Sequence, residues 1–281
     1  MNGILLVNKD VGMTSFDVVA KLRRILHEKS IGHTGTLDPN ASGLLIVLIG
    51  KNTKLLPYCV SNHKKYHATF SFGKRSTTED VWGEIVEERE PKSHTQDELE
   101  SVASSMVGKS IQIPPMYSAV KVNGKKLYEY ARSGEIVERP KKEIEVDEFV
   151  VKQIGENDYS LDAIVSSGTY VRTLIQDYAE KLGEVAIMTS LVRYSIESLK
   201  VENAYTLEQI ENGEYSFISP YEVIDPELEL VEYDDEMSIR NGKKIKLHAK
   251  KDNVIIVKDK KILAAYSKRN DGYYHAQRGL F

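Results

Sequence analysis

The chain has 281 residues, of which 41% are hydrophobic, 28% charged and 8% aromatic, and its formal net charge is −4. This composition supports a large buried core and excludes a disordered or low-complexity protein. No apolar run approaches the ~18 residues of a membrane span and the first residues do not form a secretory signal, so we expect a cytoplasmic protein outside the membrane. The single Cys59 excludes an internal disulfide and a cysteine-based zinc or iron–sulfur centre.

The charges are segregated along the sequence. Residues 1–75 hold 11 basic and 4 acidic residues, residues 76–239 hold 15 and 35, and residues 240–281 hold 12 and 3. Two basic ends around an acidic middle favour a polyanionic partner that is bound at two places. On this ground alone, a solvated lysine-rich surface explains the pattern equally well.

The hydrophobic pattern alternates between strands and helices and contains no internal repeat. Strands are predicted over residues 4–7, 44–49, 65–72, 117–122, 143–151 and 158–165. Helices are predicted over 15–29, from Thr95 to about Val107, from the Asn123-Gly124 turn to Gly134, from a cap at 166–169 to Gly183, and from Thr206 to Gly213. An acidic segment, Asp225–Glu236, precedes the basic end. We therefore expect a main domain over 1–236 and a small β-rich module over 237–281.

Several common chemistries are excluded by residue spacing. Gly43 and Gly50-Lys51 enclose an apolar run, but their spacing is not that of a P-loop. His63 and His67 stand four residues apart without the glutamate of a zinc protease motif. We expect no metal and no organic cofactor.

The polar loop Gly32–Pro39 reads GHTGTLDP and contains Asp38. Taken alone, an aspartate before proline is a turn residue. The whole string closely resembles the motif of the TruB-type pseudouridine synthases, in which this aspartate is catalytic. Further family motifs follow in order: Lys65-Tyr66, then Thr77, Asp80 and Gly83, then PPMYSAVK at 114–121, GTYVR at 168–172, and Leu191 with Arg193. Asp10, Asn40 and Ser42 depart from the family pattern.

The resemblance implies an α+β fold, in which a mixed, largely antiparallel sheet is flanked by helices, with a small PUA-like RNA-binding module at the end. It implies that Asp38 is catalytic, that Tyr66 stacks on the target base, and that Arg172 pairs with Asp38. The remaining residues expected to bind substrate are His33, Lys9, Lys54, Lys64, Asp80, Lys121, Tyr170 and Leu191.

The implied activity is the isomerisation of uridine 55 in the T-loop of tRNA to pseudouridine, with tRNA as the only required partner and the protein as a monomer. The carboxylate attacks the sugar, attacks the base, or removes a ribose proton, and the sequence leaves these routes open. Two other classes remain. One is a non-catalytic RNA-binding or RNA-folding protein on the same scaffold, and the other is an N-glycoside hydrolase that releases free uracil.

Overall fold

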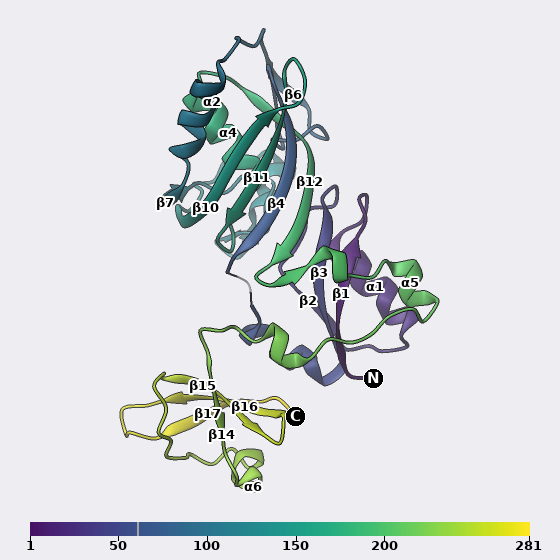
Figure 1. Cartoon of the computed structure of the whole chain (residues 1–281), viewed down its shortest axis with the longest axis vertical. Helices are drawn as coiled ribbons and strands as arrows, with labels where there is room; N and C mark the ends of the chain where they lie inside the picture. Colours follow the sequence, from purple (N-terminus) through teal and green to yellow (C-terminus); the bar gives the residue numbers. More distant parts are fainter. Residues whose placement is uncertain (61) are drawn as a thin grey trace. The chain divides into compact units, whose positions relative to one another are not determined.

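The computed structural model describes residues 1–60 and 62–281, which divide into two compact units (Figure 1). The first unit combines Met1–Pro39, Gly43–Ser61 and Leu199–Phe281, and the second combines Asn40–Ser42 and Asn62–Ser198. The expected α+β class is confirmed, with sheets and helices in both units.

The first unit begins with three antiparallel strands. Strand β3 (Ser42–Ile49) pairs with both β1 (Gly3–Lys9) and β2 (Ile31–Thr34). Helices α1 (Ser15–Ile25) and α5 (Leu207–Glu211) contribute side chains to the same buried core as these strands. Other short elements of this unit are β13 (Leu199–Lys200) and the 3₁₀ turns Gly50–Tyr58, Val201–Asn203 and Pro220–Val223.

Helix α1 is shorter than its periodicity predicts. It ends at Ile25 instead of Lys29, because the backbone of His27 has a positive φ of 49° that no right-handed helix can contain. Its start has a capping box, in which Thr14 accepts a hydrogen bond from the backbone of Asp17 and the Asp17 carboxylate accepts one from Thr14.

The end of the chain forms a separate sheet with its own buried cluster of apolar side chains. Its strands, in spatial order, are β14 (Glu229–Glu232), β15 (Asn253–Lys258), β16 (Lys261–Lys268) and β17 (Tyr274–Gly279), with α6 (Glu236–Arg240) beside them. Strand β14 pairs in parallel with β15, although it lies inside the acidic segment and before the predicted boundary at residue 237. The terminal sheet therefore begins earlier in the chain than the charge pattern predicts.

An antiparallel run of strands forms the centre of the second unit. These strands, in spatial order, are β12 (Ala186–Ile196), β4 (Lys64–Phe72), β11 (Asp158–Val165), β10 (Lys142–Gln153) and β7 (Gly108–Gln112). The alternation predicted for β4 is confirmed, because Tyr66, Ala68, Phe70 and Phe72 are all buried on one face.

Helices α2 (Gln96–Ser104) and α4 (Val171–Lys181) lie over the same face of this sheet (Figure 1). The Tyr178 ring of α4 is fully buried and packs against the rings of Phe70, Phe72 and Phe149. Its hydroxyl donates to the carbonyl of Leu99 on α2 at 3.1 Å, which joins the two helices. The capping box predicted at Thr95 is confirmed.

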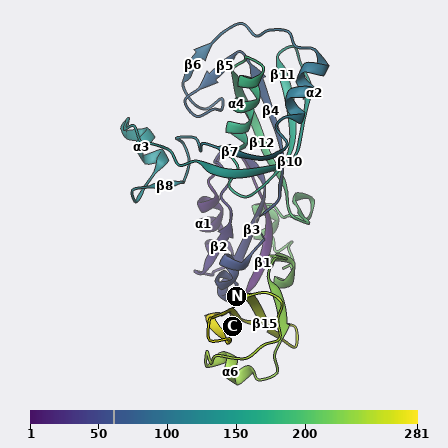
Figure 2. The same ribbon diagram turned by 90° about the vertical axis from the view of Figure 1, so that its left-hand side faces the viewer.

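Two hairpins complete the second unit (Figure 2). Strands β5 (Lys74–Ser76) and β6 (Ile85–Glu88) form one of them. The other joins β8 (Lys121–Val122) to β9 (Lys125–Lys126) through Asn123 and Gly124, both with positive φ, and continues into α3 (Leu127–Ser133). Most of the strand predicted over 117–122 is loop, because only its last two residues find a pairing partner.

Candidate active site

The loop that carries Asp38 is fixed on both sides of that residue. Before it, Leu37 is 3% exposed, and its N–H donates to the Ser15 hydroxyl at 2.9 Å at the start of α1. After it, the Pro39 carbonyl accepts hydrogen bonds from Gly12 N–H at 2.9 Å and from Lys9 Nζ at 3.1 Å. The half-buried Asp38 carboxylate is therefore presented by a backbone that is hydrogen-bonded on both sides.

The ammonium of Lys9 contacts backbone carbonyls around the Asp38 loop, and the expected contact of Lys9 with substrate stays a prediction. The side chain is wholly buried, and its ammonium donates to the carbonyls of Asp10, Met13 and Pro39 at 2.8, 2.7 and 3.1 Å. Lys9 therefore joins the backbone of Asp10 and Met13 to Pro39 in the loop of Asp38.

His33 and Lys54 lie in the same unit as Asp38. His33 is half-buried on β2, opposite Val47 of β3. Lys54 lies in the 3₁₀ turn after β3, and its ammonium donates to the backbone oxygen of Phe281 at 2.9 Å. Its expected phosphate contact stays a prediction.

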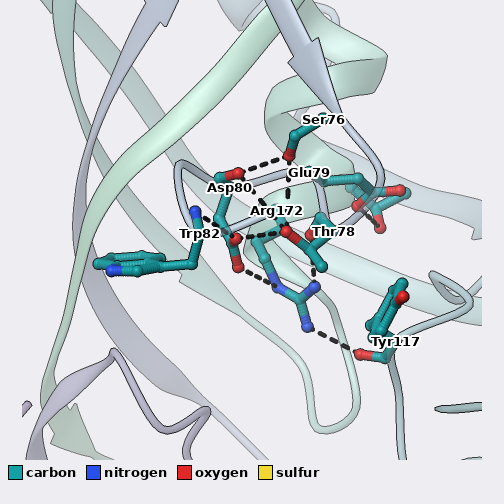
Figure 3. A network of polar contacts seen from close by, with 8 residues as sticks. Ser76, Thr78, Glu79, Asp80, Trp82, Tyr117 and Arg172 are labelled. Atoms are coloured by element: carbon teal, nitrogen blue, oxygen red, sulfur yellow. Dashed lines mark hydrogen bonds and ion pairs between the residues drawn. The ribbon is translucent and has the colours of Figure 1, made fainter. Parts of the chain in front are cut away.

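Arg172 is the centre of a buried polar network in the second unit (Figure 3). It lies in the first turn of α4 and is 3% exposed. Its guanidinium donates to the carbonyls of Thr78 and Tyr117 at 2.7 and 3.1 Å, and its Nε lies 4.0 Å from Oδ2 of Asp80. The planar guanidinium thus fixes two loops by directed hydrogen bonds. The expected pairing of Arg172 with Asp38 stays a prediction.

Asp80 organises the turn between β5 and β6. Its Oδ1 accepts hydrogen bonds from the Thr78 hydroxyl and, at 3.2 Å, from the backbone N–H of Trp82. The turn is so tight that a Cβ on Gly83 would lie 2.3 Å from Oγ1 of Thr78, which explains the glycine of the motif. The sequence motif emphasises Thr77, but it is the hydroxyl of Thr78 that binds the carboxylate.

Sequence reasoning missed two residues that position α4. The carboxylate of Glu79 accepts a hydrogen bond from the Thr173 hydroxyl at 2.8 Å, and burial raises the pKa of Glu79. Gln112 of β7 bonds both backbone groups of Tyr170, with its amide oxygen 2.8 Å from the N–H and its amide nitrogen 3.1 Å from the carbonyl. Neither residue carries a local signal, because each partner lies more than fifty positions away in the sequence.

The start of α4 also differs from the prediction of a cap at 166–169. The N-cap residue is Tyr170, whose side chain makes no capping hydrogen bond. The Ser166 hydroxyl instead accepts from the backbone N–H of Glu145 on β10 at 2.8 Å. Tertiary contacts therefore replace the local cap.

Tyr66, Lys64 and Leu191 lie on the buried face of neighbouring strands. Tyr66 is 8% exposed on β4, and Leu191 is opposite Ala68 on β12. Lys64 is 6% exposed, and its ammonium donates to the Ser167 hydroxyl at 3.1 Å. Burial, with the nearby charges of Arg193 and Lys142, lowers the pKa of Lys64 to about 8.

Lys121 is exposed on β8, in a hairpin rich in cations and aromatic rings. The closest of these contacts places the ammonium of Lys125 4.5 Å from the ring centre of Tyr130. Lys126 and Arg132 both lie over the ring of Tyr128.

The described residues contain no group of three or more potential metal ligands from histidine, cysteine, aspartate and glutamate. His63 and His67 are each bound to a carboxylate instead, Asp147 at 2.7 Å and Asp162 at 2.9 Å. Within 1–60 and 62–281, no helix is long and apolar enough to cross a membrane.

Comparisons with known proteins agree with this arrangement. The model of the TruB family pseudouridylate synthases, N-terminal domain, matches residues 23–171. The tRNA pseudouridine synthase B of Oenococcus oeni is 42% identical over 99% of this chain and 98% of its own length, and that of Mesoplasma florum is 38% identical over the same shares. A chain from the crystal structure of a Cbf5-Nop10-Gar1 complex has the same fold, with a TM-score of 0.72 and 22% identity over 99% of this chain and 85% of that one. The chain therefore belongs to the TruB family of pseudouridylate synthases, which are isomerases.

Proposed function

We propose that this protein converts uridine 55 in the T-loop of tRNA to pseudouridine. The C1′–N1 glycosidic bond breaks, the base turns over, and a C1′–C5 bond forms. N1 gains a proton and C5 loses one, so the composition of the RNA is unchanged. The name of the relatives, tRNA pseudouridine synthase B, supports tRNA as the substrate class.

The observation that carries the proposal is the fixed backbone around Asp38. Leu37 is tied to Ser15, and Pro39 is tied to Gly12 and Lys9. A group that must meet a reacting atom gains rate from being held in place before the substrate arrives. The carboxylate acts as a nucleophile at the sugar, as a nucleophile at the base, or as a base toward a ribose proton, and all three routes require this placement.

Arg172 and Tyr66 are proposed to complete the site. Arg172 supplies a buried, permanently charged group whose orientation is set by Thr78 and Tyr117. Tyr66 offers an aromatic face for the base and a hydroxyl for the sugar. Tyr170 and Leu191 are proposed to shape the pocket, and Asp80 to brace it through Arg172.

The target nucleotide must leave its stack before the chemistry, and binding elsewhere must offset that energetic cost. We propose that His33 fills the vacated space in the RNA, and that Lys54, Lys64 and Lys121 contact phosphates. The cations and tyrosines of β8, β9 and α3 suit RNA, because they combine charge with stacking surfaces. The terminal sheet and its basic segment are proposed as a second RNA contact.

The test is incubation of the protein with an unmodified tRNA transcript, followed by detection of pseudouridine at single-nucleotide resolution. We expect modification at position 55 alone, and Asp38→Asn should lose several orders of magnitude in turnover while still binding tRNA. More than about a tenth of normal activity in that variant, with wild-type contamination excluded, would refute the role of Asp38.

The same assay separates the two alternative functions. An N-glycoside hydrolase would release free uracil and leave an abasic ribose. A non-catalytic RNA-binding or RNA-folding protein would bind the transcript and leave position 55 as uridine.

A further inference from the structure

The turn between β5 and β6 displays the only tryptophan of the chain. Trp82 is 49% exposed, and the neighbouring apolar residues Val81, Ile85 and Val86 are exposed as well. Exposing an indole to water is unfavourable, and a tryptophan at such a place contributes little to the core. A large exposed aromatic side chain therefore suggests a contact with another molecule.

The indole is attached to a backbone that is held firmly. The N–H of Val81 donates to the carbonyl of Met188 on β12 at 3.0 Å, and the N–H of Met188 donates to the carbonyl of Glu79 at 3.2 Å. The N–H of Trp82 itself donates to Asp80 at 3.2 Å. We call the Trp82 indole on this fixed backbone the platform. A fixed aromatic side chain loses little conformational entropy when a ligand stacks on it.

This platform is connected directly to the proposed active site. One oxygen of the Asp80 carboxylate holds the backbone of Trp82, and the other lies 4.0 Å from Nε of Arg172. In Figure 3 the indole extends on the side of Asp80 opposite to the guanidinium. If the target uridine lies at Arg172, the indole is positioned for a neighbouring nucleotide.

The charges of the hairpin show what kind of contact this surface can make. Lys74 pairs with Glu88 at 2.9 Å and Arg75 with Glu87 at 2.6 Å, so the cations of the hairpin are already bound to carboxylates. The hairpin therefore offers an apolar aromatic face with no surplus of positive charge. Stacking on a nucleobase uses such a face, whereas phosphate binding does not.

We propose that Trp82 stacks on an unpaired base next to the target uridine and so fixes the position of the RNA relative to Arg172. This proposal rests on the proposed function, because it takes tRNA as the substrate. The occupant is a nucleobase because the hairpin presents an exposed indole while its cations are paired with carboxylates. Asp80 joins this indole to Arg172, which places the base next to the target uridine.

The indole is its own reporter, since no other tryptophan contributes to the fluorescence. The full-length Asp38→Asn protein, which prevents turnover, is titrated with an unmodified T-arm stem-loop RNA while binding is followed independently by filter retention. We expect quenching of the indole and protection from acrylamide, both saturating with the binding curve. An indole that stays equally accessible to acrylamide at saturating RNA overturns the proposal.

Substitutions in the otherwise wild-type protein provide the second measurement. We expect Trp82→Ala to raise KM and the Kd for tRNA by roughly tenfold, with a smaller change in kcat, and Trp82→Phe to restore most of the affinity. The slope of log Kd against log salt should stay the same, because the substitution removes no ion pair. Ile154→Ala removes an exposed apolar side chain outside this hairpin and should change neither constant.

The possible failures are distinguishable. Unchanged KM and Kd in Trp82→Ala, beside normal modification of tRNA, overturn the role of Trp82 alone. Protection of the indole that depends on protein concentration and not on RNA overturns it in favour of a protein interface. A wild-type protein that neither binds nor modifies tRNA overturns both this proposal and the proposed function.

Discussion

Arg172 and Asp80 form a buried ion pair that joins helix α4 to the turn between β5 and β6. The Nε of Arg172 and the Oδ2 of Asp80 are 4.0 Å apart, and the two side chains are 4% and 13% exposed. At this separation the pair contributes more through charge than through a direct hydrogen bond, and the hydrogen bonds of the guanidinium are directed at the carbonyls of Thr78 and Tyr117. The position of Arg172 therefore depends on its shape as well as its charge.

The first prediction tests whether the planar shape of the Arg172 guanidinium is required in addition to its charge. Arg172→Lys keeps a positive charge but cannot donate to Thr78 and Tyr117 at once with a fixed fork. We expect roughly 100-fold or greater loss of kcat, with a much smaller change in tRNA affinity. Arg172→Met should be worse, because Asp80 then loses its buried counter-charge. Single-turnover rates and Kd values measured side by side provide the check.

Arg89→Lys is the matched control, since Arg89 also donates to a backbone carbonyl, that of Gly183 at 3.0 Å, but at an exposed place. It should retain full turnover. Near-normal turnover of Arg172→Lys would show that only the charge is needed, and near-normal turnover of Arg172→Met would remove Arg172 from the site.

The second prediction concerns the buried ammonium of Lys9. Lys9→Met removes the ammonium donor from the carbonyls of Asp10 and Met13, and leaves the Pro39 carbonyl with the Gly12 N–H alone. We expect a loss of a few kcal/mol in the free energy of unfolding, on the scale of ~1–3 kcal/mol for each buried group left unsatisfied. Turnover should fall further than the fraction of folded protein, because the loop of Asp38 loses an anchor.

Urea denaturation gives the free energy of unfolding. The kcat is measured without urea, under conditions where the variant is fully folded. Lys21→Met, which removes an exposed lysine from α1, should change neither quantity. A stable Lys9→Met protein with normal kcat would mean that the Ser15 and Gly12 contacts hold the loop without Lys9.

The third prediction is a pH dependence of stability. Burial lowers the pKa of Lys64 from its ordinary 10.5 to about 8, so between these values the unfolded chain binds more protons than the folded protein. The contribution of Lys64 to the free energy of unfolding therefore increases with pH from about 8 to 10.5, by roughly 3 kcal/mol at most. Below pH 8 Lys64 is charged in both the folded and the unfolded protein, so the folded protein has the full free-energy cost of burying the ammonium.

Lys64→Met removes this titration. The difference in unfolding free energy between wild type and variant, measured by urea denaturation from pH 7 to pH 10, should shift in favour of the wild type above pH 8. Lys65→Met is the control, because Lys65 lies on the same strand with a half-exposed side chain that pairs with Glu148 at 3.8 Å. Parallel pH profiles for wild type and Lys64→Met would contradict the prediction.

The fourth prediction concerns the basic terminal module. Because β14 belongs to its sheet, a deletion from residue 237 would leave that strand without its partner β15, so charge neutralisation is the cleaner experiment. Lys243, Lys246 and Lys250 are exposed, and we expect their joint substitution by glutamine to weaken tRNA binding.

The slope of log Kd against log salt should become shallower by about 0.9 for each phosphate that these lysines no longer neutralise. Turnover at saturating tRNA should be retained, since the site residues are unchanged. An unchanged slope would mean that these lysines are solvated in the complex.

Features that depend on near neighbours could be predicted from the order of the residues alone. The capping boxes at Thr95 and Thr206 need only residues three positions apart, and both form as predicted. The alternation of β4 follows from the pleat of a single strand, so it correctly predicts the buried face that carries Tyr66. The family motifs name Asp38 and Arg172 as site residues, and these roles stay predictions; Asp38 lies on a fixed loop and Arg172 in a buried network.

The groups that these residues contact could not be predicted in this way, because they come from distant segments. Arg172 meets the carbonyls of Thr78 and Tyr117, which are 94 and 55 positions away, and Lys9 meets that of Pro39, 30 positions away. The sequence alone does not show whether the ammonium of a lysine lies in water or, as in the buried Lys9, donates to three backbone carbonyls. The difference is set by how the strands and loops close around it, because burial and hydrogen-bond partners are properties of the packed chain and not of the local sequence.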